Sequence, residues 1–131
     1  MIKENVLTAL SALGFIPEEI TGFGYRILFE GVTMIYAVED EEAACLTFTV
    51  PDVFDISDDN RVVVLEAMVK LSGKLKYVQP YIMFDNQVWL NYQHYLGKTE
   101  VTPELLEHII NVLAYSTYTI HNFINGIDND D

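Results

Sequence analysis

The sequence predicts an α+β domain of two layers, in which an antiparallel sheet carries helices on one face. Three observations predict it. Apolar residues recur at spacings of three and four near the start, middle and end of the chain. The segments between them are rich in β-branched and aromatic residues, as strands are. Short turns of Gly, Asp, Asn and Glu divide those segments. The expected order is helix, three strands, helix, two strands, helix (α-β-β-β-α-β-β-α).

The first helix and the first three strands form the predicted N-terminal half. Apolar spacing predicts a helix over 2–13, which Gly14 ends with a left-handed residue. The turn at Glu30-Gly31 predicts a hairpin, because Gly31 tolerates a positive φ. Pro51 is expected to stop the third strand. The strands of this antiparallel meander are expected at 25–29, 32–38 and 45–50.

A middle helix is expected over 59–71, after a connector at 52–57. Ser57 or Asp58 is expected to cap its start, and Gly73 to end it. Its apolar residues fall into two neighbouring rows, listed as Val62, Leu65 and Val69 on one face and Val64, Met68 and Leu71 beside them.

The second half contains a hairpin and the longest helix. Strands are expected at 76–84 and 87–95 around an Asp85-Asn86 turn, and Pro80 predicts an edge position for the first of them. Thr102 is expected to cap a helix of about 23 residues that opens with Pro103 and runs toward Gly126.

Composition restricts the class of protein. The chain has 131 residues, 20 acidic and 7 basic, for a net charge of −13. This length predicts one domain at 1–127, followed by an acidic tail at 128–131. The acidity argues against nucleic acid as a partner, and no apolar stretch approaches the ~18 residues that a membrane span needs. The single Cys45 and the lack of a signal peptide predict a cytoplasmic protein.

This order of elements resembles the type III secretion chaperone-like fold, and most closely its YbjN-like branch. The resemblance rests on the middle helix, the second hairpin and the start of the last helix, at residues 61–68 (RVVVLEAM), 81–90 (YIMFDNQVWL) and 102–106 (TPELL). It implies a small, acidic, dimeric bacterial protein that binds other polypeptides without catalysis. It implies no catalytic residue and no cofactor.

Aromatic residues of the second hairpin are the candidate binding site. Trp89 lies among polar neighbours on the strand face opposite Val88, Leu90 and Tyr92, and such a tryptophan is suited to anchor a partner. A homodimer is expected through the middle helix and this hairpin. The candidate protein-binding residues are Trp89, Tyr92, Tyr81, Tyr77, Leu65 and Val69.

Two other functions stay open at this point. One is an enzyme without a recognisable motif, built around His94, His108 or His121, although no nucleophile or metal-ligand motif accompanies them. The other is a sensor of a small ligand or divalent ion that uses the acidic 52–59 loop. That loop lacks the glycine and terminal glutamate of a calcium loop, so solvated helix-capping carboxylates are favoured and no metal is expected.

Overall fold

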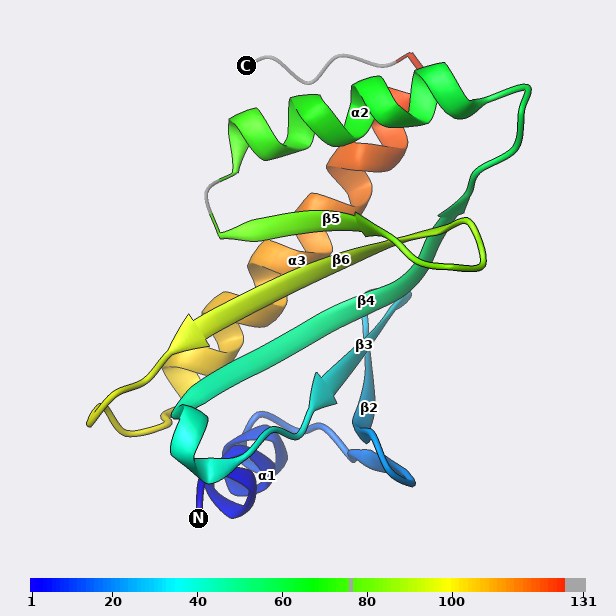
Figure 1. The fold of residues 1–131 in the computed structure, drawn as a ribbon. Helices are drawn as coiled ribbons and strands as arrows, with labels where there is room; N and C mark the ends of the chain where they lie inside the picture. Colours follow the sequence, from blue (N-terminus) through cyan, green and yellow to red (C-terminus); the bar gives the residue numbers. More distant parts are fainter. Residues whose placement is uncertain (76, 127–131) are drawn as a thin grey trace.

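The computed structural model describes residues 1–75 and 77–126; Lys76 and the predicted acidic tail at 128–131 lie outside the described residues. The α+β class and the expected order of elements are confirmed (Figure 1). One short strand, β1, was not predicted. The elements are α1 (Ile2–Ala12), β1 (Glu18–Ile20), β2 (Gly24–Phe29), β3 (Val32–Ala37), a 3-10 turn (Glu41–Ala43), β4 (Cys45–Asp55), α2 (Arg61–Lys74), β5 (Val78–Ile82), β6 (Gln87–Tyr95) and α3 (Pro103–Ile124).

The strands form one antiparallel sheet of six strands in the order β1-β2-β3-β4-β6-β5. The hairpins β2–β3 and β5–β6 come from neighbouring segments, whereas the pairing of β4 with β6 joins the two halves of the chain. Pro80 lies in β5 at one edge of the sheet, as predicted. Glu18 and Glu19 lie in β1 at the other edge.

Local turn and cap chemistry was predicted well. Glu30 and Gly31 both adopt positive φ, at 50° and 79°, as predicted. The second hairpin turn is longer than the predicted Asp85-Asn86 pair, because β5 ends at Ile82 and not at residue 84. The Met83 N–H donates to the Gln87 carbonyl at 2.8 Å, so residues 84–86 form this turn, in which Asn86 has φ 61°. The Leu105 N–H donates to the Thr102 hydroxyl at 3.2 Å, so Thr102 caps α3 with Pro103 as its first residue. These features need only neighbouring residues, which is why the sequence indicates them.

The third strand does not stop at Pro51, which corrects the prediction. β4 continues to Asp55 and pairs with β6 on both sides of a register shift between Val50 and Phe54. Pro51, Asp52 and Val53 all lie opposite the single residue Trp89, so this stretch is a bulge. Asp52 has φ 51° there. A bulge lets a strand continue past a proline that cannot donate a hydrogen bond.

The bounds of α2 also differ from the prediction. The helix begins at Arg61 with Asn60 as its N-cap, not Ser57 or Asp58, and runs through Gly73 to Lys74. Asn60 is held instead by the end of β4: its side-chain amide donates to the Asp55 carbonyl at 2.9 Å and accepts from the Ser57 N–H at 2.8 Å. The start of α2 therefore depends on where β4 ends.

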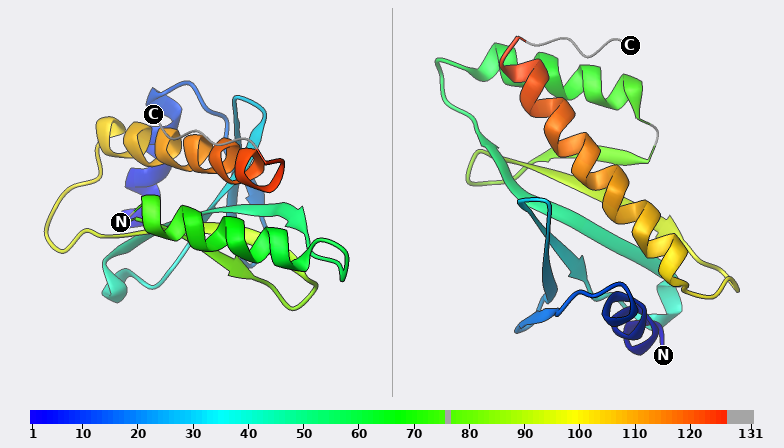
Figure 2. Two further views of the ribbon diagram at one scale, coloured as in Figure 1. Left: turned by 90° about the horizontal axis from the view of Figure 1, so that it is seen from above. Right: turned by 180° about the vertical axis from the view of Figure 1, so that it is seen from behind.

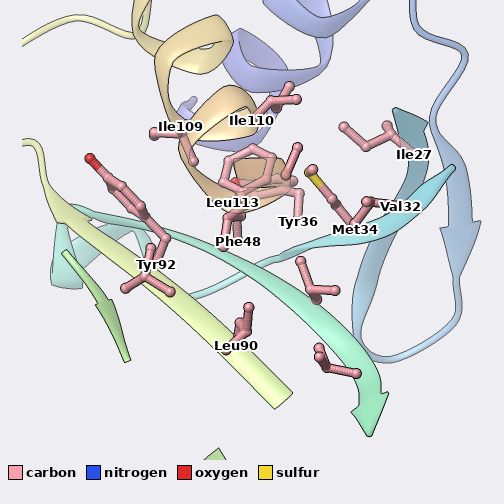
Figure 3. Packing of buried hydrophobic residues seen from close by; sticks show 14 of the residues in the cluster. Ile27, Val32, Met34, Tyr36, Phe48, Leu90, Tyr92, Ile109, Ile110 and Leu113 are labelled. Carbon is pink, nitrogen blue, oxygen red and sulfur yellow. The ribbon is translucent and has the colours of Figure 1, made fainter. Parts of the chain in front are cut away.

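The core lies between the sheet and α3, with α1 near the N-terminal end of α3 and α2 near its C-terminal end (Figure 2). Figure 3 shows Met34, Tyr36 and Phe48 from the sheet beside the α3 residues Ile109, Ile110 and Leu113. From α2 only Val64, Ala67 and Leu71 are buried. The outward row of α2 is thus left exposed by the part of the chain that the structure describes.

Candidate protein-interaction surface

Three α2 residues form an exposed apolar row, which we call the α2 stripe: Val62, Leu65 and Val69. Val62 and Val69 are 68% and 72% exposed. Their spacing of three and four residues places them on one side of the helix, opposite the side that packs on α3 and β5. Contiguous apolar surface of this kind is typical of interfaces.

The β5–β6 hairpin lies beside α2 (Figure 1), and it has exposed aromatic residues on it and next to it. Tyr77, Tyr81 and Phe84 are 62%, 46% and 99% exposed. Tyr77 and Tyr81 border a hollow of about 210 Å³ floored by polar residues of β5 and β6. Their rings offer apolar area with a hydroxyl that can find a partner, a combination enriched at protein interfaces.

Trp89 is partly buried and held in a fixed orientation. Its indole N–H donates to an Asp52 carboxylate oxygen at 3.3 Å, and its ring stacks on Phe23 with 6.5 Å between centroids and 16° between planes. Asp52 lies in the β4 bulge and Phe23 in the turn between β1 and β2, so three distant segments meet at this ring.

Trp89 lies in a cavity of about 720 Å³ between β3 and the bulge of β4, which we call the β3–β4 cleft. Ile20, Phe23, Thr33, Ile35, Asp52 and Trp89 are among its lining residues. The opposite side of the cleft is formed by α3 at Thr117, Tyr118 and His121. The predicted protein-binding residues include Trp89 but not Phe23 or Thr33, and Asp52 was considered only as part of the alternative ion-sensing loop, because only the folded chain brings these residues together.

Tyr92 is not at the surface. It is 3% exposed and lies in the core opposite Phe48. Burial raises the pKa of its phenol, and the nearby Tyr77 raises it further; their ring centroids are 6.1 Å apart. Of the six predicted binding residues, four are exposed, Trp89 lies in the β3–β4 cleft, and Tyr92 packs inside.

The histidines are separate from one another. His94 lies on β6 beside Tyr92, and His108 is exposed near the start of α3. His121 borders the β3–β4 cleft with its ring centroid 5.9 Å from that of Phe54, and burial lowers its pKa. Of the three histidines considered for an enzyme, His121 borders this cleft, and His94 and His108 do not.

The acidic 52–59 segment is not one loop. Asp52 and Asp55 lie on β4, where they accept hydrogen bonds from the side chains of Trp89 and Gln87. Within residues 1–75 and 77–126, no group of three or more His, Cys, Asp or Glu side chains is arranged to hold a metal ion. None of the helices in the described part of the chain has the length and apolarity to cross a bilayer.

The fold is that of the type III secretion chaperone-like class, as two comparisons with solved structures show. YbjN from E. coli superimposes with a TM-score of 0.66 at 12% identity, covering 89% of this chain and 87% of that one. The Yersinia pestis secretion chaperone SycH, solved in complex with a stable fragment of YscM2, gives 0.63 at 12% identity over 92% and 99% of the two chains.

A protein from Methanothermobacter thermautotrophicus has the same fold, with a TM-score of 0.66 at 10% identity over 96% and 98% of the chains. No protein-family model matches the sequence, and neither does any curated protein. At these identities the comparisons establish the fold.

Proposed function

We propose that this chain is a non-catalytic, chaperone-like protein-binding domain of the cytoplasm that forms a homodimer through the α2 stripe and the β5–β6 hairpin. The observation that carries the proposal is the α2 stripe, an exposed apolar row on a chain whose net charge is −13. High net charge keeps a protein soluble, so an apolar row retained within it is best explained by a protein partner.

The neighbouring fold supports polypeptide binding as the general role. SycH was solved with a fragment of another protein, so a domain of this fold can hold a polypeptide. Our chain has the exposed aromatic rings that such contacts use, at Tyr77, Tyr81 and Phe84. Cys45 is a free thiol, as in a reducing compartment.

Light scattering during size-exclusion chromatography tests the dimer. The wild-type chain should elute at twice 14.9 kDa, about 30 kDa, at micromolar concentration. Leu65→Glu and Val69→Glu should return the mass of one chain, because each places a charge in the apolar contact. Ile16→Glu is the matched control, since Ile16 is 87% exposed and lies before β1, away from α2.

A wild-type mass of about 15 kDa at that concentration would remove the dimer from the proposal. If Ile16→Glu lowers the measured mass as much as Val69→Glu does, the α2 stripe is not the dimer interface. Leu65→Glu and Val69→Glu should keep the circular dichroism spectrum of the wild type, because Leu65 and Val69 do not belong to the core cluster.

A further inference from the structure

The β3–β4 cleft opens where the hydrogen-bond ladder between the two strands ends early. β3 and β4 pair only at Ile35 with Thr49, Tyr36 with Phe48, and Ala37 with Thr47. Continued in register, the next bonded pair would join Thr33 to Pro51. Proline has no N–H, so Pro51 cannot donate to the Thr33 carbonyl, and the paired ladder ends at Ile35 and Thr49. The bulge at Pro51–Val53 then bends β4, and the β3–β4 cleft lies between this bulge and the start of β3.

Thr33 lies beyond the paired part of β3 and has no partner residue in β4. β3 bonds to β2 through its even-numbered residues, because Val32 flanks the two-residue turn and the Val38 N–H just beyond it donates to the Phe23 carbonyl at 3.1 Å. Thr33 therefore directs its N–H and C=O toward β4. No β4 residue pairs with it in the described part of the chain, and Thr33 borders the cavity. An unpaired strand edge is a template for another strand.

The walls of the cleft define the side chains of such a strand. Ile20, Ile35 and the stacked rings of Phe23 and Trp89 provide an apolar and aromatic surface. Charge comes from Asp52, and from Arg26, whose guanidinium is already paired with Glu18 at 3.2 Å. Two more acidic residues border the cleft: Glu18 is paired with the lining residue Arg26, and the Glu30 carbonyl accepts a hydrogen bond from the lining residue Tyr118. Together with the net charge of −13, they make the cleft attract a basic segment and repel an acidic one.

We infer that the β3–β4 cleft binds an extended polypeptide segment, which pairs with Thr33, inserts an apolar side chain against Trp89 and Phe23, and directs a basic side chain to Asp52. This inference rests on the proposed protein-binding function and adds to it a site inside the sheet, separate from the α2 stripe. Addition of a strand to free backbone supplies affinity, and the alternating side chains supply specificity.

A display library of short random peptides, selected on the purified protein, tests the inference. Enriched sequences should combine apolar residues with Lys or Arg. Trp89 is the only tryptophan in the chain, so its emission reports on the cleft when a tryptophan-free synthetic copy of an enriched peptide is added. The emission should shift and saturate with the peptide.

Two variants probe the contacts one by one. Thr33→Pro removes an N–H that faces β4 beyond the end of the paired ladder. It should weaken the affinity for the peptide about threefold to tenfold, the effect of one hydrogen bond. Asp52→Asn keeps an acceptor for the Trp89 N–H, and asparagine tolerates the positive φ at this position. It should still weaken the affinity for a peptide that contains lysine about threefold, because the negative charge is lost. It should leave unchanged the affinity of the same peptide with glutamine for lysine. Asp40→Asn is the control of equal charge change.

The inference is overturned if no peptide is enriched, if the emission of Trp89 does not change, or if Thr33→Pro and Asp52→Asn both bind as the wild type does. The dimer measurement uses no peptide and different residues. If no peptide binds in the cleft while the protein remains a 30 kDa dimer, this site alone is rejected. If the protein is a monomer that binds peptides in the cleft, the dimer alone is rejected.

Discussion

Leu71 and Val69 provide a direct test of which side of α2 belongs to the core. Leu71 is 0% exposed and part of the core cluster, whereas Val69 is 72% exposed. Leu71→Ala should leave a cavity and lower the free energy of unfolding by about 3 kcal/mol, within the ~2–5 kcal/mol of such substitutions. In a chain of this length that corresponds to a fall in Tm of about 10 °C. Val69→Ala should cost less than about 0.5 kcal/mol.

Urea unfolding followed by circular dichroism measures both values. The two substitutions are best made in a Leu65→Glu background, because self-association would add concentration-dependent stability. If Val69→Ala proves as costly as Leu71→Ala there, the orientation of α2 is wrong. A loss below about 1 kcal/mol for Leu71→Ala would equally refute its placement in the core.

Two glycines and one histidine allow further predictions. Gly24→Ala should prevent folding or lower the free energy of unfolding by several kcal/mol, since a Cβ there would lie 1.9 Å from the Tyr36 carbonyl oxygen. Gly73 lies in a helix with open space around it, so Gly73→Ala should raise the free energy of unfolding by about 0.5–1 kcal/mol in the same urea assay. His121 has a pKa below its unfolded value, so the unfolded chain binds more protons, and stability should fall as pH drops through about 6.5 toward the folded pKa. His121→Gln should remove that part of the pH dependence, and an unchanged profile between about pH 5 and 8 would contradict it.

Features set by a few adjacent residues were predicted from the sequence. The turn at Glu30-Gly31, the cap at Thr102 and the bounds of β6 all followed from local chemistry. The prediction that Pro51 ends its strand was wrong because it, too, used only local sequence. A proline interrupts the hydrogen bonds to one neighbouring strand, and a central strand has two neighbours. Here the pairing of β4 with β3 ends before Pro51, while its pairing with β6 continues to Asp55.

The candidate site was predicted only in part, because its exposure depends on contacts distant in sequence. Both rows of α2 are apolar, so periodicity alone does not tell whether Val69 or Leu71 faces the core. Tyr92 shares its face with Leu90, and the pairing of β6 with β4 buries that face. The stacking of Trp89 on Phe23 joins residues from opposite halves of the chain, and no local pattern indicates it.

The two outer edges of the sheet have a consequence for behaviour at high concentration. β1 has only three residues, two of them glutamates, and β5 contains Pro80. Short, charged or proline-containing edges are poor templates for the endless strand-to-strand stacking that builds fibrils. A chain with an apolar stripe on one helix is thereby expected to form closed, finite assemblies rather than amyloid.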